Sequence, residues 1–485
     1  MKLYDIIANL KFIGIKNYQE IEIDALSCSS KEKLSNGIYF CIKGMNSDGH
    51  DYAIESIKNG AVCLVVEKYL DLPICQILVD DVRTTMSYIS SVFYKTDKSK
   101  MKFVGITGTN GKTTTTFIIR DILYKLGKKV GLIGTQGIYI NSLLLPNNLT
   151  TPDPIDLHKA IYDMGHNACE YCIMEVSAHS IALNKIDHIN YDVVGLTNIT
   201  KDHLDFFVNM DNYVKCKASL FDVKHANSGV INLDAKHSKE IAKKANIDIK
   251  TIGKDGQLKL LSTNQNLKVT DFKIEYNQKT YSSRTNLIGD YNISNLLMAI
   301  ACLTNLGFSI KEILDIVKTT EFEIPGRFNV LNVNANFNVV VDYAHTPDGI
   351  TNILSTIKKM PISKLITVFG CGGNRDKTKR PEMCKAATSL SDYTIVTTDN
   401  PRNENPDMII DDVVRDNTSK NIARITDRRS AIEYALSIAK ENDVVAILGK
   451  GAETYQEVNG IKLHFSDYEV VDNYFKYTLK NELKA

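Results

Sequence analysis

Residues 102–127 read KFVGITGTNGKTTTTFIIRDILYKLG, which places a buried-strand pattern, a loop rich in Gly and Thr and a helical pattern in immediate succession. The backbone N–H groups of such a loop, with the N-terminus of the helix behind them, form a concave site for phosphate oxygens. Lys112 is expected to reach the β- and γ-phosphates, and the Thr113 hydroxyl is expected to bind Mg²⁺. The stretch therefore predicts a nucleotide-binding domain of the α/β class.

This loop is a variant of the general phosphate-loop pattern. That pattern, G-x-x-x-x-G-K-[ST], has a glycine five residues before Gly111, where this chain has Ile106. A Gly/Thr turn without a ligand is the alternative, and the order of strand, loop, lysine and helix argues against it. Nucleotide binding alone does not name the reaction.

Further strand patterns follow the loop. Three apolar runs separated by helical patterns come first: KVGLIGT (129–135), YCIMEVS (171–177) and VVGLTNI (193–199). After the turn at Pro325 and Gly326 a second series follows: FNVVVDYAH (337–345), KLITVFGCGG (364–373), YTIVTTDNP (393–401) and DVVAILGKG (443–451). This alternation predicts parallel sheets covered by helices. Because ligands gather beyond the carboxyl ends of such strands, the polar residues that follow these runs are the candidate site.

The N-terminal part of the chain has shorter apolar runs, namely GIYFCIKG (37–44), AVCLVVE (61–67) and CQILVDD (75–81), with helical patterns between them. They predict a small α/β domain over the first 98 residues or so. The polar stretch KTDKSK (95–100) predicts a linker. Since 485 residues are too many for one ordinary core, several domains are expected.

The composition excludes several classes of protein. The chain is 44% hydrophobic and 24% charged, which is typical of globular proteins, and its net charge of +1 gives no basic field for nucleic acid. The start, MKLYDIIANLKF, lacks a signal-peptide core, and no apolar run is long enough to span a bilayer, so a cytoplasmic protein without a membrane partner is expected. Of ten cysteines, only Cys169 and Cys172 form C-x-x-C; without a second pair, they are expected to be core thiols rather than a zinc or redox site.

Ten further segments resemble one protein family. They are LTTPDP (149–154), MEVSAHS (174–180), TNITKDHLDF (197–206), CKASLF (216–221), GDYNISN (289–295), PGRF (325–328), DYAHTPD (342–348), GCGGNRDKTKRP (370–381), DNPRNENP (399–406) and GKGAETYQ (449–456). With GITGTNGKTTT before them, they resemble the Mur ligases and their folylpolyglutamate synthetase relatives. The likeness covers nearly the full length, is strongest from about 103 to 456, and is greatest to the diaminopimelate-adding branch.

The resemblance implies an α/β protein of three domains. Residues 1–98 would bind the uridine end of the substrate, residues 99–325 would form a parallel-sheet ATPase domain with the phosphate loop, and residues 326–485 would form a Rossmann-like domain for the incoming amino acid. The implied activity is an ATP-dependent amide ligase of peptidoglycan synthesis, which adds meso-2,6-diaminopimelate to UDP-N-acetylmuramoyl-L-alanyl-D-glutamate through an acyl phosphate. ATP would be the co-substrate and Mg²⁺ the cofactor, and a monomer is expected.

An acyl phosphate joins two anions, so its site must neutralise charge and hold the reactants in line. The resemblance implies that Lys112, His203 and Lys217 are catalytic, that Thr113, Glu175 and His203 bind Mg²⁺, and that Lys217 is carbamylated to N6-carboxylysine and holds a second Mg²⁺. Seen without the family, Lys217 is a helix lysine on a solvated face, and His203 is an ordinary core or surface histidine.

The remaining implied contacts fall into two groups around the substrates. The ATP contacts are Gly108, Thr109, Asn110, Gly111, Lys112, Thr113, Thr114, Asn292, Asn295, Arg327, Asp342 and His345. The contacts to the nucleotide-linked peptide are Ser30, Thr150, Thr151, Ser177 and Lys185. Lys185 replaces the arginine usual in relatives, which keeps the charge but loses the bidentate fork. Without the family, the asparagines would cap helices and Asp342 would form a turn.

A third group of implied contacts would form the diaminopimelate pocket: Arg375, Asp399, Asn400, Pro401, Arg402, Gly449 and Glu453. Diaminopimelate carries a distal carboxylate that lysine lacks, and Arg402 in DNPR can bind a carboxylate bidentately. In the family, the DNPR form goes with the diaminopimelate-adding enzyme, and Glu453 is expected to face the distal ammonium. The plainer interpretation pairs Arg402 with Glu404.

Three alternatives stay open at this point: a lysine-adding ligase, a folylpolyglutamate synthetase, and a phosphate-loop kinase or NTPase that makes no amide. A kinase has no need of charged loops at the strand ends of the third region. Release of ADP only in the presence of both acid and amine distinguishes a ligase from that last class.

Overall fold

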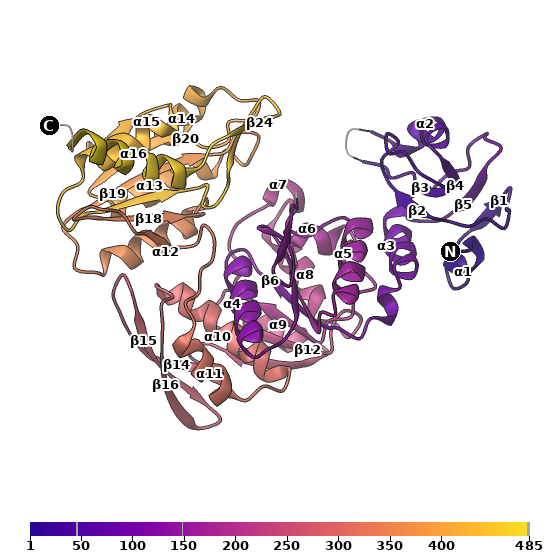
Figure 1. The fold of residues 1–485 in the computed structure, drawn as a ribbon, viewed down its shortest axis with the longest axis horizontal. Coiled ribbons are helices and arrows are strands. Elements are labelled where there is room, and N and C mark those ends of the chain that lie inside the picture. The colour runs from indigo at the N-terminus through magenta and orange to yellow at the C-terminus, as the bar shows by residue number, and fades with distance from the viewer. Residues whose placement is uncertain (45–46, 148, 483–485) are drawn as a thin grey trace.

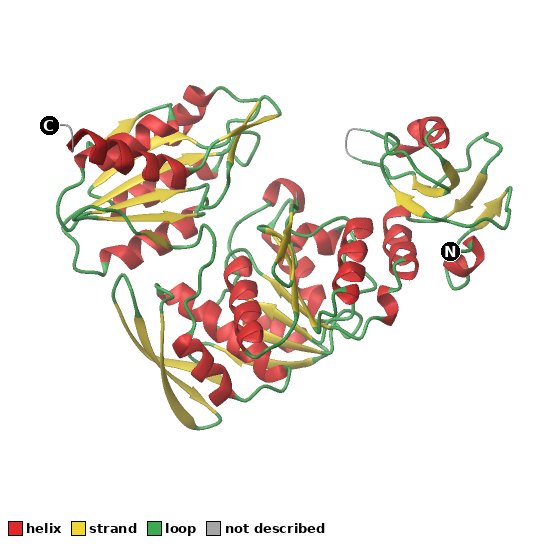
Figure 2. Ribbon diagram, in the orientation of Figure 1, coloured by secondary structure: helices red, strands yellow, loops and turns green. Residues whose placement is uncertain are grey.

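The computed structural model describes residues 1–44, 47–147 and 149–482 and, within them, three large sheets and a small hairpin. The N-terminal and C-terminal sheets lie on either side of a central, eleven-stranded sheet (Figure 1). Helices pack against each of the three sheets (Figure 2). The predicted α/β class is confirmed. No helix in the described ranges is long and apolar enough to cross a membrane.

The N-terminal sheet has the strand order β1 (Gly14–Lys16), β5 (Cys75–Leu78), β4 (Ala61–Val66), β3 (Gly37–Phe40) and β2 (Ala25–Ser27). β1 runs antiparallel to β5, and the other pairs are parallel. Three helices and a 3₁₀ turn accompany these strands: α1 (Leu3–Ile7), η1 (Gly49–Tyr52), α2 (Ala53–Lys58) and α3 (Val82–Phe93). α3 begins after Asp81, whose carboxylate accepts the N–H groups of Arg83 and Thr84.

The polar stretch 95–100, which the sequence predicts to be a linker, joins α3 to the central region. It contains the 3₁₀ turn η2 (Thr96–Lys98), and Thr96 is buried with its hydroxyl 2.6 Å from Nδ1 of His158. His158 lies on α5 (Pro154–His166) of the central region, which α3 contacts directly. The Ser87 hydroxyl, on α3, also donates to the carbonyl oxygen of Asp187 at 2.7 Å. Within the stretch Thr96 is buried, whereas Lys95, Asp97, Lys98 and Lys100 are exposed. The stretch therefore connects the N-terminal region to the central one and also packs against it.

The central sheet has inner parallel strands and antiparallel strands at both edges. Its order is β16 (Lys279–Thr285), β15 (Thr270–Tyr276), β14 (Leu258–Gln265), β13 (Asp248–Ile252), β12 (Ser228–Asn232), β11 (Val193–Leu196), β6 (Lys102–Thr107), β10 (Tyr171–Glu175), β7 (Val130–Gly134), β8 (Gly137–Ile140) and β9 (Leu143–Leu145). The predicted runs form β6, β7, β10 and β11, which pair in parallel. The expectation of a parallel sheet is therefore correct for the inner strands and wrong for β8, β9, β15 and β16.

Two helix layers cover this sheet and anchor the phosphate loop. α4 (Lys112–Lys125) and α10 (Asp290–Asn305) pack on one face together with α11 (Ile310–Thr319), and their core includes Val104, Ile106 and Phe117. The other face carries α5, α6 (Ala178–Ala182), α7 (Leu204–Phe207), α8 (Met210–Ala218), η3 (Ser219–Phe221) and α9 (Ser238–Lys244). Burial of one large apolar side chain contributes roughly 1.5–3 kcal/mol. The strand before the loop and the helix after it are thus held by the same core.

The C-terminal sheet presents four predicted strands side by side. Its order is β17 (Asn329–Leu331), β18 (Asn338–Asp342), β22 (Val444–Leu448), β19 (Leu365–Cys371), β20 (Tyr393–Thr398) and β21 (Ile422–Arg424). Helices α12 (Pro347–Lys358), α13 (Lys379–Leu390), α14 (Pro406–Val414), α15 (Arg428–Ile438) and α16 (Asp467–Glu482) surround it, and β23 (Tyr455–Val458) pairs with β24 (Ile461–His464). Because β18, β22, β19 and β20 are parallel, their carboxyl ends meet at one edge.

Candidate active site

The phosphate loop, residues 107–114, has a backbone that requires glycine. Gly108 and Gly111 have φ values of 148° and 86°. A Cβ at Gly108 would lie 1.9 Å from Oγ1 of Thr197, and one at Gly111 would lie 2.3 Å from Oδ1 of Asn295. The glycines therefore allow the segment TNIT (197–200) and helix α10 to approach the loop closely.

The segment 197–200, just after β11, braces the loop. The Thr197 hydroxyl donates to the carbonyl oxygen of Asn110 at 2.6 Å, and Oδ1 of Asn198 accepts the N–H of Asn110 at 2.9 Å. The backbone N–H of Thr200 donates to the Thr109 hydroxyl at 3.0 Å. These contacts fix the loop before any phosphate binds, which lowers the reorganisation that binding requires.

Lys112 and Thr113 stand at the start of α4, where the sequence predicts the phosphate and metal contacts. Nζ of Lys112 donates to the carbonyl oxygens of Gly108 and Thr109 at 2.8 and 2.9 Å. Burial lowers the pKa of this ammonium, against the opposing effect of the nearby Glu175 carboxylate. The Thr113 hydroxyl donates to Oε2 of Glu175 at 3.0 Å and accepts from Nη2 of Arg327 at 3.1 Å.

Glu175 is buried at the end of β10 and faces the mouth of the loop. Its Oε1 accepts the N–H of Thr135 at 2.9 Å, and its Oε2 accepts the hydroxyls of Thr113 and Thr135 at 3.0 and 3.1 Å. These hydrogen bonds fix the position of the carboxylate at the mouth of the loop. Gly134 leaves room for it, since a Cβ there would lie 2.3 Å from Oε1 of Glu175.

His203 caps the N-terminus of α7 in the left-handed region, with φ 54°. Its Nε2 lies 3.4 Å from Oδ2 of Asp202, and its ring meets that of His179 edge-on at 4.7 Å. The ring is 45% exposed, and its partial burial lowers the pKa of the imidazole below its ordinary value, despite the Asp202 carboxylate beside it. The ring is therefore neutral at pH 7 and keeps a nitrogen lone pair, which a metal ligand requires.

Lys217 is fully buried, so the interpretation of a lysine on a solvated face is wrong. Its Nζ, on α8, donates to Oγ1 of Thr107 at 3.2 Å and to the carbonyl oxygen of Gly108 at 3.1 Å. Burial lowers the pKa of this amine well below its ordinary value, and the neighbouring Lys112 lowers it further. The nitrogen lies against the phosphate loop itself.

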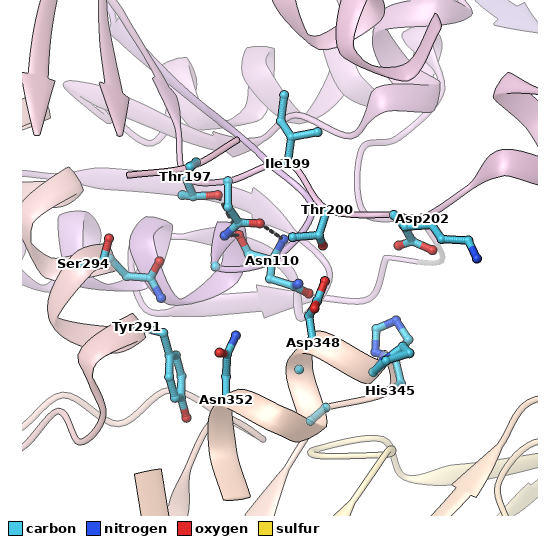
Figure 3. A pocket seen from close by; sticks show the side chains of 18 of the residues that line it. Asn110, Thr197, Ile199, Thr200, Asp202, Tyr291, Ser294, His345, Asp348 and Asn352 are labelled. Atoms are coloured by element: carbon cyan, nitrogen blue, oxygen red, sulfur yellow. Dashed lines mark hydrogen bonds between the residues drawn. The ribbon is translucent and has the colours of Figure 1, made fainter. Parts of the chain in front are cut away.

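A cavity of about 860 Å³ lies beside the phosphate loop and contains most of the expected ATP contacts. Asn110, Thr197 and Thr200 form one wall, and His345, Asp348 and Asn352 face them from the start of α12 and the loop before it (Figure 3). Gly111, Thr114, Asn292, Asn295, Arg327 and Asp342 also line it. The sequence did not indicate Asn352, because an asparagine inside an amphipathic helix pattern carries no motif.

The carboxylate of Asp342 accepts hydrogen bonds from the backbone of two separate segments. Its Oδ2 accepts the N–H of Phe328 and its Oδ1 that of Ala344, both at 2.7 Å. Burial raises the pKa of the carboxyl group, against the effect of the nearby Arg327. The turn interpretation therefore holds for Asp342, although the residue also borders the cavity.

A second cavity, of about 490 Å³, joins the phosphate loop to the C-terminal sheet. Lys112, Thr113, Thr150, Glu175 and His203 line one side. The other side consists of loops at the carboxyl ends of β19, β20 and β22, which contribute six of the seven expected amino-acid contacts: Arg375, Asp399, Asn400, Arg402, Gly449 and Glu453. The strand-end loops of the C-terminal sheet and the phosphate loop therefore open onto one space.

Arg402 has a different partner from the one that its sequence neighbours suggest. Its Nε donates to Oε2 of Glu457 at 3.1 Å and its Nη1 to the carbonyl oxygen of Gly373 at 2.8 Å. Glu404 instead pairs with Arg380 and Lys377. The Arg402–Glu404 pair is wrong because the left-handed backbone at Arg402, φ 51°, turns its side chain towards β23.

Glu453 is paired before any substrate binds. Its Oε2 accepts from Nζ of Lys450 at 2.9 Å and from Nδ2 of Asn400 at 3.0 Å. Lys450 is fully buried and was not expected in the site, since a lysine between two glycines is typical of a solvated loop. Asp399 is the complementary case: within the described part of the chain, its buried Oδ2 has no hydrogen-bond partner. An unpaired buried carboxylate oxygen is costly, and a ligand ammonium would satisfy it.

The expected contacts to the nucleotide-linked peptide are more dispersed. Thr150 lines the smaller cavity, and Thr151 is bonded to the N–H of Ser177 at 3.1 Å. Lys185 pairs with Asp153 at 2.7 Å. Ser30 lies in the N-terminal region, where its hydroxyl donates to Glu55 at 2.5 Å.

The residues at the loop mouth suit Mg²⁺ better than a transition metal. Across the described ranges, no group of three or more His, Cys, Asp or Glu side chains is arranged to hold a metal. Thr113 and Glu175 instead offer a hydroxyl and a carboxylate 3.0 Å apart, beside the phosphate loop. Mg²⁺ prefers such oxygens and takes its other ligands from phosphate and water.

The ten cysteines are free, and Cys169 and Cys172 are buried thiols as expected.

Comparison with known proteins agrees with this geometry. Residues 106–303 match the Mur ligase middle domain, and residues 326–451 match the Mur ligase, glutamate ligase domain. The chain belongs to the Mur ligase family. It is 39% identical over 484 residues to UDP-N-acetylmuramoyl-L-alanyl-D-glutamate–2,6-diaminopimelate ligase 1 of Clostridium acetobutylicum, covering 98% of this chain and 99% of that protein.

Solved structures show the same fold. A structure of UDP-N-acetylmuramoyl-L-alanyl-D-glutamate–2,6-diaminopimelate ligase superimposes with a TM-score of 0.67 at 28% identity, covering 94% of this chain and 95% of that one. The MurF ligase of Thermotoga maritima in complex with ADP gives a TM-score of 0.66 at 19% identity, covering 94% and 98%.

Proposed function

We propose that this chain is an ATP-dependent ligase that adds meso-2,6-diaminopimelate to UDP-N-acetylmuramoyl-L-alanyl-D-glutamate in peptidoglycan synthesis. The observation that carries the proposal is the 490 Å³ cavity, lined on one side by the phosphate loop and on the other by Arg375, Arg402 and Asp399. A phosphoryl donor and an amino acid with two carboxylates would meet there. The relatives named as diaminopimelate ligases support the choice of amine.

The proposed division of labour follows the three sheets. Residues 1–98 would bind the uridine end, with Ser30 among the contacts, and residues 99–325 would bind ATP and the peptide, with Thr150, Thr151, Ser177 and Lys185. Residues 326–485 would bind the incoming amino acid. The contact of η2 with α5 and the hydrogen bond from Ser87 of α3 to Asp187 support a fixed placement of the first two regions.

The reaction would proceed in two substitutions. A carboxylate oxygen of the D-glutamyl residue attacks the γ-phosphorus of ATP, the bond to the β-phosphate oxygen breaks, and ADP leaves. The amine of diaminopimelate then attacks the acyl carbon, phosphate departs with the bridging oxygen, and the nitrogen loses a proton as the amide forms. Repulsion between the carboxylate and the phosphate oxygens is the main barrier to joining these two anions. Lys112, Arg327 and the N–H groups of the loop would reduce it by stabilising the negative charge of the phosphate oxygens.

Thr113, Glu175 and His203 would hold Mg²⁺. Mg²⁺ bound there would offset phosphate charge and orient the transferred group. Lys217 would carry a carbamate: its neutral amine attacks carbon dioxide, forms a C–N bond and releases one proton. The modification would replace the buried amine with an anion that can serve as a further metal ligand. Two observations support it: Lys217 is fully buried, and among the described residues no carboxylate lies at ion-pair distance from its nitrogen.

The test is steady ADP release with the three substrates omitted one at a time. We expect turnover only when ATP, UDP-N-acetylmuramoyl-L-Ala-D-Glu and meso-diaminopimelate are all present. ADP release that continues without the acid or the amine would instead identify an NTPase or kinase.

A further inference from the structure

The two loops that carry Arg375 and Arg402, residues 372–376 and 399–404, are bonded into one unit. The N–H of Gly373 donates to the carbonyl oxygen of Asn400 at 2.9 Å, and Nη1 of Arg402 donates back to Gly373 at 2.8 Å. The N–H of Asn403 donates to Oδ1 of Asn374 at 3.0 Å. Residue 373 must be glycine here, since a Cβ would lie 1.9 Å from the carbonyl oxygen of Pro401.

Arg380, on the first turn of α13, contacts both loops of this unit. Its side chain is 1% exposed. Its Nη2 lies 3.0 Å from both carboxylate oxygens of Glu404, which belongs to the second loop, and 3.4 Å from the carbonyl oxygen of Gly372, which belongs to the first. Its Nη1 donates to Asp412 of α14 at 2.8 Å. One guanidinium therefore contacts both loops and one outer helix.

Glu404 completes the connection between the loops. Its carboxylate accepts the N–H of Asn374 at 2.5 Å and lies 3.2 Å from Nζ of Lys377. Although burial favours the protonated form, the hydrogen bonds from Asn374, Arg380 and Lys377 hold the pKa of Glu404 below its ordinary value. The carboxylate is thus ionised and bridges the two loops at neutral pH.

Arg380 borders the 490 Å³ cavity, but its Nη atoms are committed to Glu404, Gly372 and Asp412. Arg375 and Arg402 also line the cavity, from the two loops that Arg380 joins, and Arg402 is held there by Glu457 and the carbonyl oxygen of Gly373. Two cations can bind two carboxylates of one ligand selectively only if the distance between the cations is fixed. A displacement of a binding group by about 1 Å can reduce the rate about 10²-fold.

We propose that Arg380 and Glu404 form a clasp that sets the position of Arg402 relative to Arg375 and so gives the site its selectivity for an amino acid with two carboxylates. This inference rests on the proposed function. Arg380 and Glu404 are positioning residues, and neither needs to touch the substrate. Substitution of either residue should therefore weaken binding of the amine substrate more than binding of ATP.

The clasp is tested with a matched pair of variants, Glu404→Gln and Asp412→Asn. Both remove a carboxylate charge from the same guanidinium, but Glu404 belongs to the second loop, whereas Asp412 lies on α14, outside both loops. Glu404→Gln should raise the KM for meso-diaminopimelate about tenfold or more and lower the diaminopimelate-to-lysine ratio of kcat/KM by a similar factor. The KM for ATP should stay within about twofold, and Asp412→Asn should leave all three values within about twofold.

Unchanged amine KM and selectivity in Glu404→Gln would overturn the clasp, as would equal effects of Asp412→Asn. Should Glu404→Gln fail to fold, Arg380→Lys keeps a buried cation but loses the planar fork, and it must raise the same amine KM.

Amide hydrogen exchange separates this proposal from the proposed function. In the ligand-free protein, Glu404→Gln should accelerate exchange in residues 372–376 and 399–404, whereas Asp412→Asn should not. If the parent chain forms no amide with diaminopimelate, the proposed function fails, and exchange alone then decides the clasp: unaltered protection in both loops of Glu404→Gln would overturn it.

Discussion

The side-chain nitrogen of Lys217 lies 3.1 Å from the carbonyl oxygen of Gly108, against the phosphate loop. Within the described residues this buried amine has no carboxylate at ion-pair distance; its other hydrogen-bond partner is the Thr107 hydroxyl. A lone buried ammonium is unfavourable, so the neutral amine is favoured, and the neutral amine is the form that reacts with carbon dioxide.

Lys217→Ala should lose most of the amide-forming activity, because the carbamate and its negative charge are lost together. Short carboxylic acids such as acetate or propionate should partly restore it by occupying the vacated space. Lys215→Ala is the control, since Lys215 lies on the same helix and is exposed. A Lys217→Ala protein of parental activity would contradict the carbamate, as would a loss that no added acid relieves.

Lys112→Ala should reduce kcat by about 10²–10³-fold, because phosphate charge in the transition state would lose a fixed cation. The initial rate of amide formation at saturating ATP measures the effect. Lys125→Ala, at the exposed end of the same helix, should retain parental rates. Near-parental turnover in Lys112→Ala would remove the phosphate-loop assignment.

Arg402→Ala should lower kcat/KM for meso-diaminopimelate far more than for L-lysine, since lysine has no distal carboxylate to lose a partner. Arg402→Lys should fall between, because it keeps the charge but not the bidentate fork. The exposed Arg415, on the neighbouring helix end, offers Arg415→Ala as the control. An unchanged ratio between the two amines in Arg402→Ala would show that another group reads the distal carboxylate.

The sequence predicts the part of the site in which polar residues directly follow a predicted parallel strand. The polar residues after β6, and those after β19, β20 and β22, were expected at the carboxyl ends of their strands, and the two cavities contain most of them. Parallel strands carry this information because each ends at the same side of its sheet. The edge strands β8, β9, β15 and β16 could not be predicted in the same way. β16, KTYSSRT, is mostly polar and resembles loop sequence until β15 pairs with it, whereas β8 and β9, GIYI and LLL, are too short to indicate the direction of their pairing.

Partners of charged residues were the least predictable feature of the site. Arg402 and Glu404 are two residues apart, yet they pair with Glu457 and Arg380, each of which comes from another element. Lys450 and Lys217 look like solvent-exposed lysines in the sequence and are both fully buried. Tertiary packing decides such partners, and no local pattern encodes it.

His158 should make the fold sensitive to acid. It is fully buried on α5, and burial lowers its pKa from 6.5 to about 3. Because the folded pKa is below the unfolded one, the unfolded chain binds the proton first as pH falls. Stability from this group is therefore full above about pH 6.5 and decreases towards pH 3, by up to about 1.4 kcal/mol per pH unit.

His158→Gln should remove about 2 kcal/mol from the loss in unfolding free energy between pH 7 and pH 5, as measured by urea denaturation at the two pH values. The exposed His166 lies on the same helix, and His166→Gln should retain the parental loss. An equal pH dependence in parent and His158→Gln would mean that His158 does not control it.

The most direct test of the account is competition between two amines for the unmodified chain. Purified protein is supplied with ATP, Mg²⁺, UDP-N-acetylmuramoyl-L-Ala-D-Glu and equimolar meso-diaminopimelate and L-lysine, and the products are resolved by mass spectrometry. A site built around Arg375 and Arg402 predicts the diaminopimelate product in at least about 10²-fold excess. Equal amounts of the two products, an excess of the lysine product, or no amide at all would contradict it.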